Sequence, residues 1–403
     1  MTESRASEVS GGVTAPRGFK ASGVACGIKA SGLPDVALIA SDGPASAAAV
    51  FTTNLAQAAP VVVSREHLAA SRGRARAVVV NSGCANACTG DDGMNHARAM
   101  AHVTGAALGC APADVLVAST GVIGVKLDMP KVERGIKAAA ASLSPDGGAD
   151  AARAIMTTDP FPKEASVEFE SRAGRFRVGG MAKGSGMIEP MMATMLAFVT
   201  TDVAVEPDVL KRALALAADQ SFNAITVDGE CSTNDCVLVL ANGASGVQLR
   251  DAGELAEALR SVCEPLAVGI VRGGEGATKL ITVRVTGAES DKDARRAARA
   301  IANSPLVKTA IHGGDPNWGR LVAVAGRSGA AFSLDGAAVR IGSVVLFADG
   351  RPYDERASEA AAYLQGRDID VEVDLGTGGN GRSQMWTCDL SAEYVRINAE
   401  YRT

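Results

Sequence analysis

Lys183-Gly184-Ser185-Gly186-Met187-Ile188-Glu189-Pro190-Met191-Met192-Ala193-Thr194-Met195-Leu196-Ala197-Phe198 is the segment from which the rest of the chain is best interpreted. A lysine in a glycine-rich turn leads into an apolar run whose one hydroxyl group, on Thr194, follows the small residue Ala193. A buried strand normally has valine or isoleucine at such a position, because these pack as well and bury no polar group. Thr194 is therefore either a β-branched strand residue with a locally bonded hydroxyl, or a nucleophile that first becomes an N-terminus.

The composition describes a globular chain. Its 403 residues are enough for two or three domains with a substantial core, and 47% of them are hydrophobic. The first twenty residues are polar and lack the apolar region of a signal peptide. No apolar stretch reaches membrane-spanning length, so we expect a cytoplasmic protein.

Charge and cysteine usage exclude several classes of partner. The net charge is −5 and aromatic residues make up 4%, which argues against a nucleic-acid groove with its basic face and stacking rings. A chain of this size without a secretory signal is expected to keep its eight cysteines as reduced thiols. Their spacing does not match that of zinc ligands, so we expect no metal site. The four histidines stand apart and do not indicate a histidine-based triad. We expect the partners to be small molecules and copies of the same chain.

Two glycine-rich segments resemble nucleotide-binding motifs but fail in detail. Lys183-Gly184-Ser185 reverses the Walker A order, in which the lysine follows the last glycine. Gly376-Thr377-Gly378-Gly379-Asn380-Gly381 matches G-x-G-x-x-G after an expected strand. Residues 384–390 look like another strand, however, so no helix N-terminus is available for a pyrophosphate. We predict a hairpin turn there and no nucleotide site.

Two further loops carry groups that could perform chemistry. Residues 114–118 form an apolar strand that ends in Ser119-Thr120-Gly121. A hydroxyl followed by a glycine can place an O–H and an N–H side by side, as an oxyanion site needs; an ordinary turn is the alternative. Glu275 lies in a glycine loop before a strand, where it is either exposed to solvent or a partner for a ligand's ammonium group.

The remaining pattern predicts an α/β chain in which strands and helices are interspersed. We expect strands at 36–40, 48–52, 61–63, 77–80, 114–118, 166–170, 175–178, 225–229, 236–240, 280–285, 369–375 and 384–390. We expect helices at 95–108, from 130, up to about 156, from 207, from 254 with a break or kink at Pro265, at 293–303 and at 354–364.

Taken together, several motifs in order resemble one family along almost the whole chain, the ornithine acetyltransferases (glutamate N-acetyltransferases) of arginine biosynthesis. The motifs that carry this resemblance are Ser119-Thr120-Gly121, Lys183-Gly184-Ser185-Gly186-Met187-Ile188 with Pro190, Ala193-Thr194-Met195-Leu196, Phe222-Asn223, Thr226-Val227-Asp228-Gly229, Ser232-Thr233-Asn234-Asp235, Asp315-Pro316-Asn317-Trp318-Gly319-Arg320 and Tyr394-Val395-Arg396-Ile397-Asn398.

The resemblance implies a self-cleaving enzyme, cut between Ala193 and Thr194 into an alpha chain (1–193) and a beta chain (194–403). It implies an α/β/β/α sandwich related to the N-terminal-nucleophile type, with a smaller α/β C-terminal domain. We expect the sandwich to span 1–280 and the smaller domain 281–403. It also implies an assembly of two alpha and two beta chains.

The resemblance further implies a role for each site residue. Thr194 would be the nucleophile, with its freed α-amine as the base. Thr120 and Gly121 would hold the oxyanion. The amino-acid substrate would contact Thr157, Lys183, Thr194, Glu275, Asn398 and Thr403. The acetyl group of N2-acetylornithine would pass to Thr194 and then to glutamate, without a cofactor. Some members also accept acetyl-CoA as the donor.

Three positions depart from the common family pattern and leave alternatives open. Cys84 replaces a frequent asparagine, and Glu189 and Met191 replace a frequent alanine and asparagine. They leave the nucleophile intact but leave the range of substrates undecided. A specialised paralogue from an antibiotic pathway is therefore an alternative. An amidase or aminopeptidase of the related fold would pass the acyl group to water instead. A non-catalytic metabolite-binding homologue would remain uncut.

Overall fold

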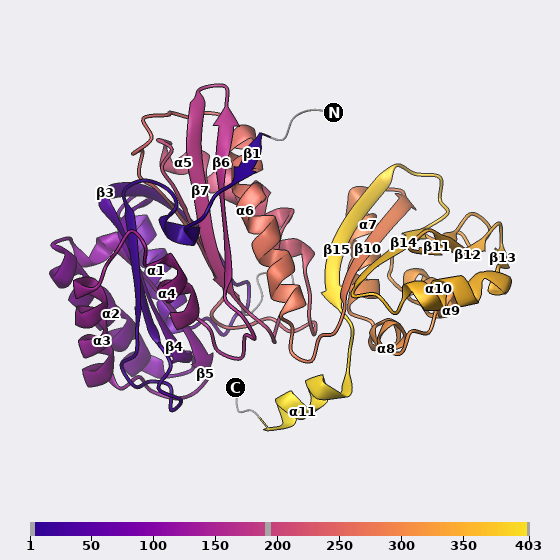
Figure 1. The fold of residues 1–403 in the computed structure, drawn as a ribbon, viewed down its shortest axis with the longest axis horizontal. Helices are drawn as coiled ribbons and strands as arrows, with labels where there is room; N and C mark the ends of the chain where they lie inside the picture. The colour runs from indigo at the N-terminus through magenta and orange to yellow at the C-terminus, as the bar shows by residue number, and fades with distance from the viewer. Residues whose placement is uncertain (1–4, 190–194, 401–403) are drawn as a thin grey trace. The chain divides into compact units, whose positions relative to one another are not determined.

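The computed structural model describes residues 5–189 and 195–400. The described chain forms two compact units, one from 1–223 and 230–270 and the other from 224–229 and 271–402 (Figure 1). The boundary expected between residues 280 and 281 remains a prediction, and residues 271–280 cluster with the second unit.

The first unit contains one mixed sheet, which has nine strands within the described residues. Their order is β1-β6-β7-β8-β9-β3-β4-β5, with β2 also paired to β3. The strands are β1 (Ala6–Glu8), β2 (Phe19–Val24), β3 (Val36–Phe51), β4 (Arg74–Cys84), β5 (Val115–Val122), β6 (Lys163–Ser171), β7 (Gly174–Lys183), β8 (Leu196–Thr201) and β9 (Cys236–Ala241).

Strand β3 divides this sheet into two halves. Its register against β4 shifts between Ala40 and Ala45, which marks a β-bulge. Before the bulge β3 pairs with β2 and β4; after it the pairing with β4 ends at Ser46, and from Ser46 to Phe51 β3 pairs with β9. The two separate strands expected at 36–40 and 48–52 are therefore one strand, because a bulge rather than a turn joins them.

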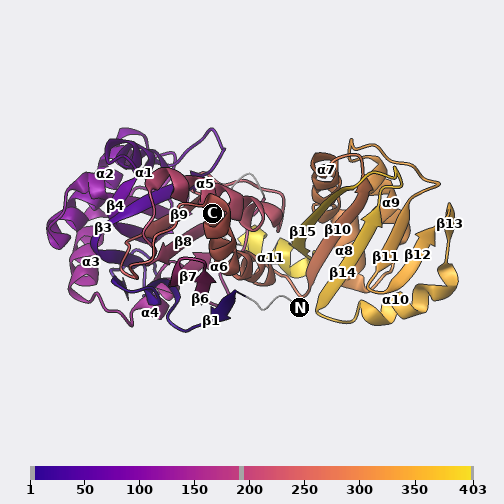
Figure 2. The ribbon, with the colours of Figure 1, turned by 90° about the horizontal axis from the view of Figure 1, so that it is seen from above.

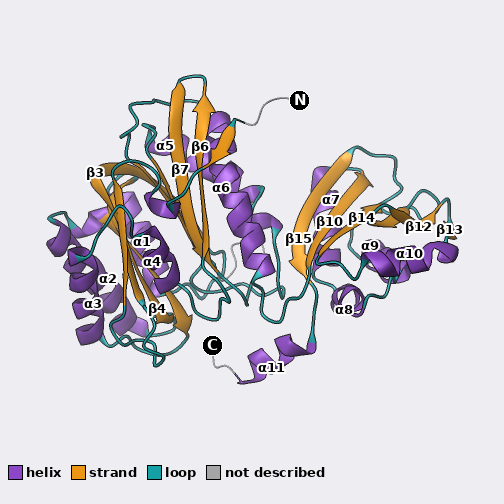
Figure 3. Cartoon of the chain, in the orientation of Figure 1, coloured by secondary structure: helices purple, strands orange, loops and turns teal. Residues whose placement is uncertain are grey.

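The two halves share an inner core and carry helices on their outer faces. The core joins Ile39, Val78 and Leu116 to Leu196, Phe198 and Leu238. Helices α1 to α3 pack on β3, β4 and β5, and α6 lies beside β7 (Figure 3). The layers form the predicted α/β/β/α sandwich. The helices of this unit are α1 (Ala59–Ala70), α2 (Gly90–Leu108), α3 (Met129–Ala141), α4 (Gly148–Ala154), α5 (Pro207–Asp219) and α6 (Ala252–Arg272).

Two predictions for local structure in this unit were wrong. Residues 61–63 lie in α1 rather than in a strand; Pro60 opens that helix, and the buried Val61 and Val63 override their β-propensity. Helix α6 continues through Pro265, so the break expected there is wrong, while the alternative of a kink stays a prediction. Its buried stripe, which includes Val262 and Leu266 against β7, holds the helix together despite the missing N–H.

The second unit is the predicted smaller α/β part. Within the described residues its sheet has six strands in the order β13-β12-β11-β14-β10-β15 (Figure 2). Alternate residues such as Ile281, Val283 and Val371 form its core. The strands are β10 (Leu280–Ala288), β11 (Ala338–Ile341), β12 (Val344–Ala348), β13 (Arg351–Pro352), β14 (Asp368–Asp374) and β15 (Gly381–Cys388). The helices are α7 (Asp291–Ala302), α8 (Pro305–Gly313), α9 (Trp318–Gly326), α10 (Ala357–Tyr363) and α11 (Ala392–Glu400).

Two corrections concern this unit. The segment 376–381 is not a hairpin turn, because β14 and β15 pair with β10 on opposite sides of it rather than with each other. Residues 225–229 form no strand, and Ile225 makes only an isolated bridge to Trp386. Short 3-10 helices complete the chain at Gly12–Thr14, Pro112–Asp114, Phe222–Ala224 and Asp354–Arg356. Within the described ranges, no helix combines the length and apolar character needed to cross a membrane.

Candidate functional site

The end of β5 holds a hydroxyl and a glycine in a strained, close-packed position. Thr120 is buried, and Gly121 has a φ of +127°. A Cβ atom at residue 121 would lie 2.3 Å from the carbonyl carbon of Gly83 on β4. Only glycine fits there, and the neighbouring ladder is irregular at Gly83 and Cys84. Such bulges commonly redirect backbone and side-chain groups next to active sites.

Buried amide side chains fix this strand end. Asn81 accepts a hydrogen bond from the hydroxyl of Ser119 over 2.6 Å. Asn234 donates to the carbonyl oxygens of Ser119 and Ala85 over 2.9 and 2.7 Å. The residue just before Thr120 is therefore held on both its side chain and its backbone, which limits movement of the hydroxyl that follows.

Lys183, the last residue of β7, connects three of the predicted site residues. Its Nζ donates to Oγ1 of Thr157 over 2.7 Å and to Oγ1 of Thr120 over 3.2 Å. A hydroxyl that accepts from an ammonium group keeps its own O–H as a donor. Thr120 and Thr157 can thus each present an O–H to an anionic or carbonyl oxygen.

Sequence reasoning missed Asp159, a buried carboxylate that organises this cluster. Its Oδ1 accepts from Nζ of Lys163 over 2.6 Å and from the backbone N–H of Gly184 over 2.7 Å. Its Oδ2 accepts from the N–H of Thr157 over 3.1 Å and lies 4.0 Å from Nζ of Lys183. Although burial opposes ionisation, Lys183 and Lys163 lower the pKa of Asp159 to about 2. In the sequence, Asp159 stands in the polar turn Thr157-Thr158-Asp159-Pro160, a composition that equally suits a helix cap or an ordinary loop.

Positive charge gathers around Asp159. Lys163 and Lys183 are both almost fully buried, and each has its Nζ within 4.0 Å of this carboxylate. Lys29 adds to the positive field: burial and, to a lesser degree, the neighbouring Lys183 lower its pKa to about 8, while Asp35 opposes the shift. A buried group of lysines suits a ligand carboxylate or an oxyanion.

The second unit holds two other predicted site residues together. Glu275 is buried with 8% of its surface exposed, so the solvent-exposed alternative is wrong. Its Oε2 accepts a hydrogen bond from Nδ2 of Asn398, on α11, over 2.9 Å. The hydroxyl of Ser391, just before α11, donates to the carbonyl oxygen of Gly276 over 2.6 Å and ties that segment to the glutamate loop. A buried carboxylate beside an amide oxygen can bind an ammonium group.

Three predicted site residues, Ala193, Thr194 and Thr403, lie outside the described residues. The departure at position 84 is described. Cys84 is buried, its Sγ donates to the carbonyl oxygen of Val125 over 3.1 Å, and burial raises the pKa of its thiol. Its side chain is thus engaged with the loop after β5.

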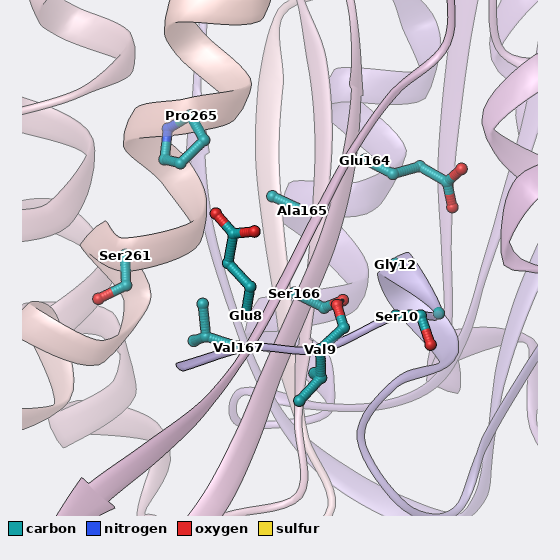
Figure 4. A pocket seen from close by; sticks show the side chains of 11 residues that line it. Glu8, Val9, Ser10, Gly12, Glu164, Ala165, Ser166, Val167, Ser261 and Pro265 are labelled. Atoms are coloured by element: carbon teal, nitrogen blue, oxygen red, sulfur yellow. Dashed lines mark hydrogen bonds between the residues drawn. The ribbon is translucent and has the colours of Figure 1, made fainter. Parts of the chain in front are cut away.

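A cavity elsewhere in the first unit is not part of this cluster. It has a volume of about 340 Å³ and lies between the N-terminal segment, β6 and α6 (Figure 4). Ser166 donates to the carbonyl oxygen of Val9 there, over 2.7 Å. None of the predicted site residues that the structure describes lines it. Among the described residues, no group of three or more His, Cys, Asp or Glu side chains is arranged to hold a metal ion.

Comparison with known proteins gives one consistent family. The model of the ArgJ family matches residues 20–403. The chain is similar to the arginine biosynthesis bifunctional protein ArgJ of Symbiobacterium thermophilum, with 52% identity over 404 residues, 98% of this chain and 99% of that protein. Its identity to the protein of the same name from Thermosynechococcus vestitus is 49% over 415 residues, again 98% and 99% of the two chains.

A solved structure is also similar. It is the ornithine acetyltransferase of Mycobacterium tuberculosis in complex with ornithine, with 44% identity, 46% of this chain and 98% of that chain covered, and a TM-score of 0.42.

Proposed function

The chain belongs to the ArgJ family, and from that premise we propose that it transfers the acetyl group of N2-acetylornithine to glutamate through an acetyl-threonine intermediate on Thr194. It is an acyltransferase of arginine biosynthesis. The observation that carries the proposal is the buried cluster of Lys183, Thr120 and Thr157, which combines an ammonium group with two hydroxyl donors.

The chain first cuts itself before Thr194. The Thr194 hydroxyl oxygen adds to the carbonyl carbon of Ala193, the C–N bond breaks, and the hydroxyl proton ends on the departing nitrogen. Water then opens the resulting ester: its oxygen bonds to the acyl carbon, the C–O bond breaks, and a proton returns to the threonine oxygen. The products are a carboxylate on Ala193 and a free α-amine on Thr194.

Acetyl transfer then uses that amine as the base. Its reference pKa of ~7.7–8.0 suits proton transfer at neutral pH. It takes the Thr194 hydroxyl proton as the oxygen attacks the acetyl group and passes it to the departing nitrogen of ornithine. In the second half, the glutamate amine attacks the acetyl ester, its proton moves through the same amine, and Thr194 regains its hydroxyl.

The residues around the reacting carbonyl have complementary tasks. The oxyanion is stabilised by the O–H of Thr120 and the N–H of Gly121; removing one such donor typically costs 10²–10³-fold in rate. Lys183 binds the substrate's carboxylate, and Thr157 adds a hydroxyl contact. Glu275 and Asn398 bind the substrate's ammonium group, and Thr403 completes the contacts. The burial of Lys183 and Glu275 supports this, because charge-assisted hydrogen bonds to a ligand are strong where water is excluded.

Further parts of the proposal concern the whole protein. We propose an α/β catalytic part over 1–280, related to the N-terminal-nucleophile type, with a C-terminal part over 281–403. Two alpha and two beta chains assemble, the protein is cytoplasmic, and the reaction needs no cofactor. Acetyl-CoA can serve as a second acetyl donor, with its thiol as the leaving group.

One experiment separates transfer from hydrolysis, the second candidate function, because an amidase would use the same nucleophile. Purified protein is supplied with N2-acetylornithine, with and without glutamate. We expect ornithine and N-acetylglutamate to form in equal amounts only when glutamate is present. Rapid acetate release that does not depend on glutamate would instead assign the protein as an amidase. A turnover confined to other acylated amino acids would indicate a specialised paralogue.

A further inference from the structure

Asp235 is a fully buried carboxyl group to which the transfer reaction gives no task. It stands at the end of the polar loop Ser232-Thr233-Asn234, immediately before β9, and none of its surface is exposed. Its Oδ1 accepts a hydrogen bond from the backbone N–H of Met195 over 3.0 Å. Met195 directly follows Thr194, and its nitrogen is separated from the Thr194 nitrogen by only two backbone atoms.

The backbone around Asp235 is fixed on both sides. Its carbonyl oxygen accepts from the N–H of Thr52 over 3.0 Å. The N–H of Cys236 donates to the carbonyl oxygen of Met195 over 3.2 Å, where β8 and β9 begin to pair in parallel. The carboxyl group is therefore held beside the chain immediately after the expected cleavage point.

The second carboxyl oxygen of Asp235 differs from the first in its hydrogen bonding. Its Oδ2 is buried and has no hydrogen-bond partner among the described residues. Buried polar atoms are rarely left unpaired, so such an atom needs an explanation. Burial raises the pKa of Asp235 well above its usual range, and the Met195 N–H, Ser232 and Lys183 only partly oppose this. Cys231 and Cys236 are the other described titratable groups that interact with it.

Self-cleavage needs a base that the transfer reaction does not supply. The α-amine of Thr194 is itself a product of cleavage, so the uncut chain must use another group. Lys183 is a hydrogen-bond donor to two hydroxyls, and Asp159 is paired with Lys163 and has a pKa of about 2, which makes it a weak base. A carboxylate with a raised pKa and an unpaired oxygen is a better base than Asp159.

We propose that Asp235 is the acid–base group of self-cleavage, which takes the hydroxyl proton of Thr194 and delivers it to the departing nitrogen. As the threonine oxygen bonds to the carbonyl carbon of Ala193, the proton moves to the Asp235 carboxylate. As the C–N bond breaks, the same proton moves to the nitrogen, and the carboxylate is restored. This role rests on the self-cleavage step of the proposed function.

The test follows cleavage in full-length precursor made by in vitro translation, sampled over time on denaturing gels. Asp235→Asn keeps the shape and the acceptor for Met195 but cannot take up a proton. We expect it to be cut at least about 100-fold more slowly than wild type, the usual scale of acid–base catalysis. Asp235→Glu keeps a carboxylate and should restore slow cutting at the same bond.

A matched control is available in the same unit. Asp202 is also buried, and it accepts from the N–H groups of Arg177 and Arg17 over 2.8 and 3.1 Å. Asp202→Asn should be cut at the wild-type rate. Circular dichroism of each variant separates slow cutting from failure to fold.

The pH dependence adds a measurement that a purely structural role would not change. Because the carboxylate form is the base, wild-type cleavage should accelerate as pH rises through the raised pKa of Asp235 and then level off. Equal cutting of wild type and Asp235→Asn, or a wild-type rate independent of pH, overturns the role of Asp235 alone. A wild-type chain that is never cut overturns self-cleavage itself, and the role of Asp235 with it.

Discussion

The ammonium nitrogen of Lys183 lies 3.2 Å from the hydroxyl oxygen of Thr120 and is the donor in that hydrogen bond. This contact orients the Thr120 hydroxyl, because an oxygen that accepts from an ammonium group directs its own proton elsewhere. It also connects a residue proposed to bind the substrate's carboxylate with one proposed to stabilise the oxyanion. Changes at Lys183 should therefore affect both binding and rate.

Replacing Lys183 by methionine tests this. The loss of charged hydrogen bonds, worth about 1.5–3 kcal/mol, predicts a fall in kcat/KM of roughly 10- to 150-fold. Steady-state kinetics with N2-acetylornithine and glutamate measure it, and we expect KM to rise and kcat to fall. The exposed Lys137 on α3 provides the control, since Lys137→Met should leave both constants unchanged. Unaltered kinetics of Lys183→Met would refute the proposed role.

Asp159 should make the stability of the protein sensitive to acid. Its pKa falls from 3.8 to about 2 in the folded chain, so its contribution is fully present above pH ~4 and is lost as pH falls toward 2. The shift corresponds to about 2 kcal/mol of unfolding free energy. Urea unfolding between pH 7 and pH 2 measures this, and Asp159→Asn should have a flatter profile than wild type over the acid range.

The same variant should be destabilised at neutral pH as well. Removing the carboxylate leaves Lys163 buried without its partner, which typically costs 3–5 kcal/mol. Adding Lys163→Met to Asp159→Asn removes that unpaired charge and should recover part of the loss. A double variant no more stable than the single one would show that the pair is not the cause.

The fold could be predicted from the sequence where local pattern and tertiary packing agree. Residues 95–108 and 280–285 have clear helical and alternating patterns, and they form α2 and β10. The β-branched pattern of residues 61–63 predicts a strand, but the segment is helical because it is buried against the sheet as part of α1. The sandwich itself depends on the bulge in β3, which brings together strands far apart in the chain, and no local pattern encodes that pairing.

The site residues also divide into those that the sequence could identify and those that it could not. Thr120, Gly121 and Lys183 stand in motifs, so the resemblance identified them. Asp159 gains its importance from Lys163, four residues later, and from Gly184, on a different segment. Asp235 gains its importance from Met195, forty residues away, and from an oxygen left unpaired among the described residues. Such relationships are set by the tertiary fold, so single-sequence reasoning could not find them.

Thr194 should be indispensable for cutting the chain. Thr194→Ala lacks the hydroxyl that attacks the preceding carbonyl, so we expect one uncut chain on a denaturing gel and no acetyl transfer. Thr194→Ser keeps a hydroxyl and should still yield two fragments. N-terminal sequencing of the larger fragment, 194–403, from wild type and from Thr194→Ser locates the cut. A Thr194→Ala protein that still appears as two fragments would place the cleavage, and with it the nucleophile, elsewhere.

Glu275 should separate substrate binding from self-cleavage. Glu275→Gln keeps an oxygen that can accept from Asn398 but removes the negative charge proposed to pair with the substrate's ammonium group. Losing that charge predicts a rise in KM for N2-acetylornithine and glutamate of roughly 10- to 150-fold, from about 1.5–3 kcal/mol. Self-cleavage involves no substrate, so the variant should still appear as two fragments. Glu275→Asp keeps the charge on a shorter side chain, so its KM should lie between the KM of wild type and that of Glu275→Gln. If Glu275→Gln binds both substrates as wild type does, the ammonium group is held by another residue.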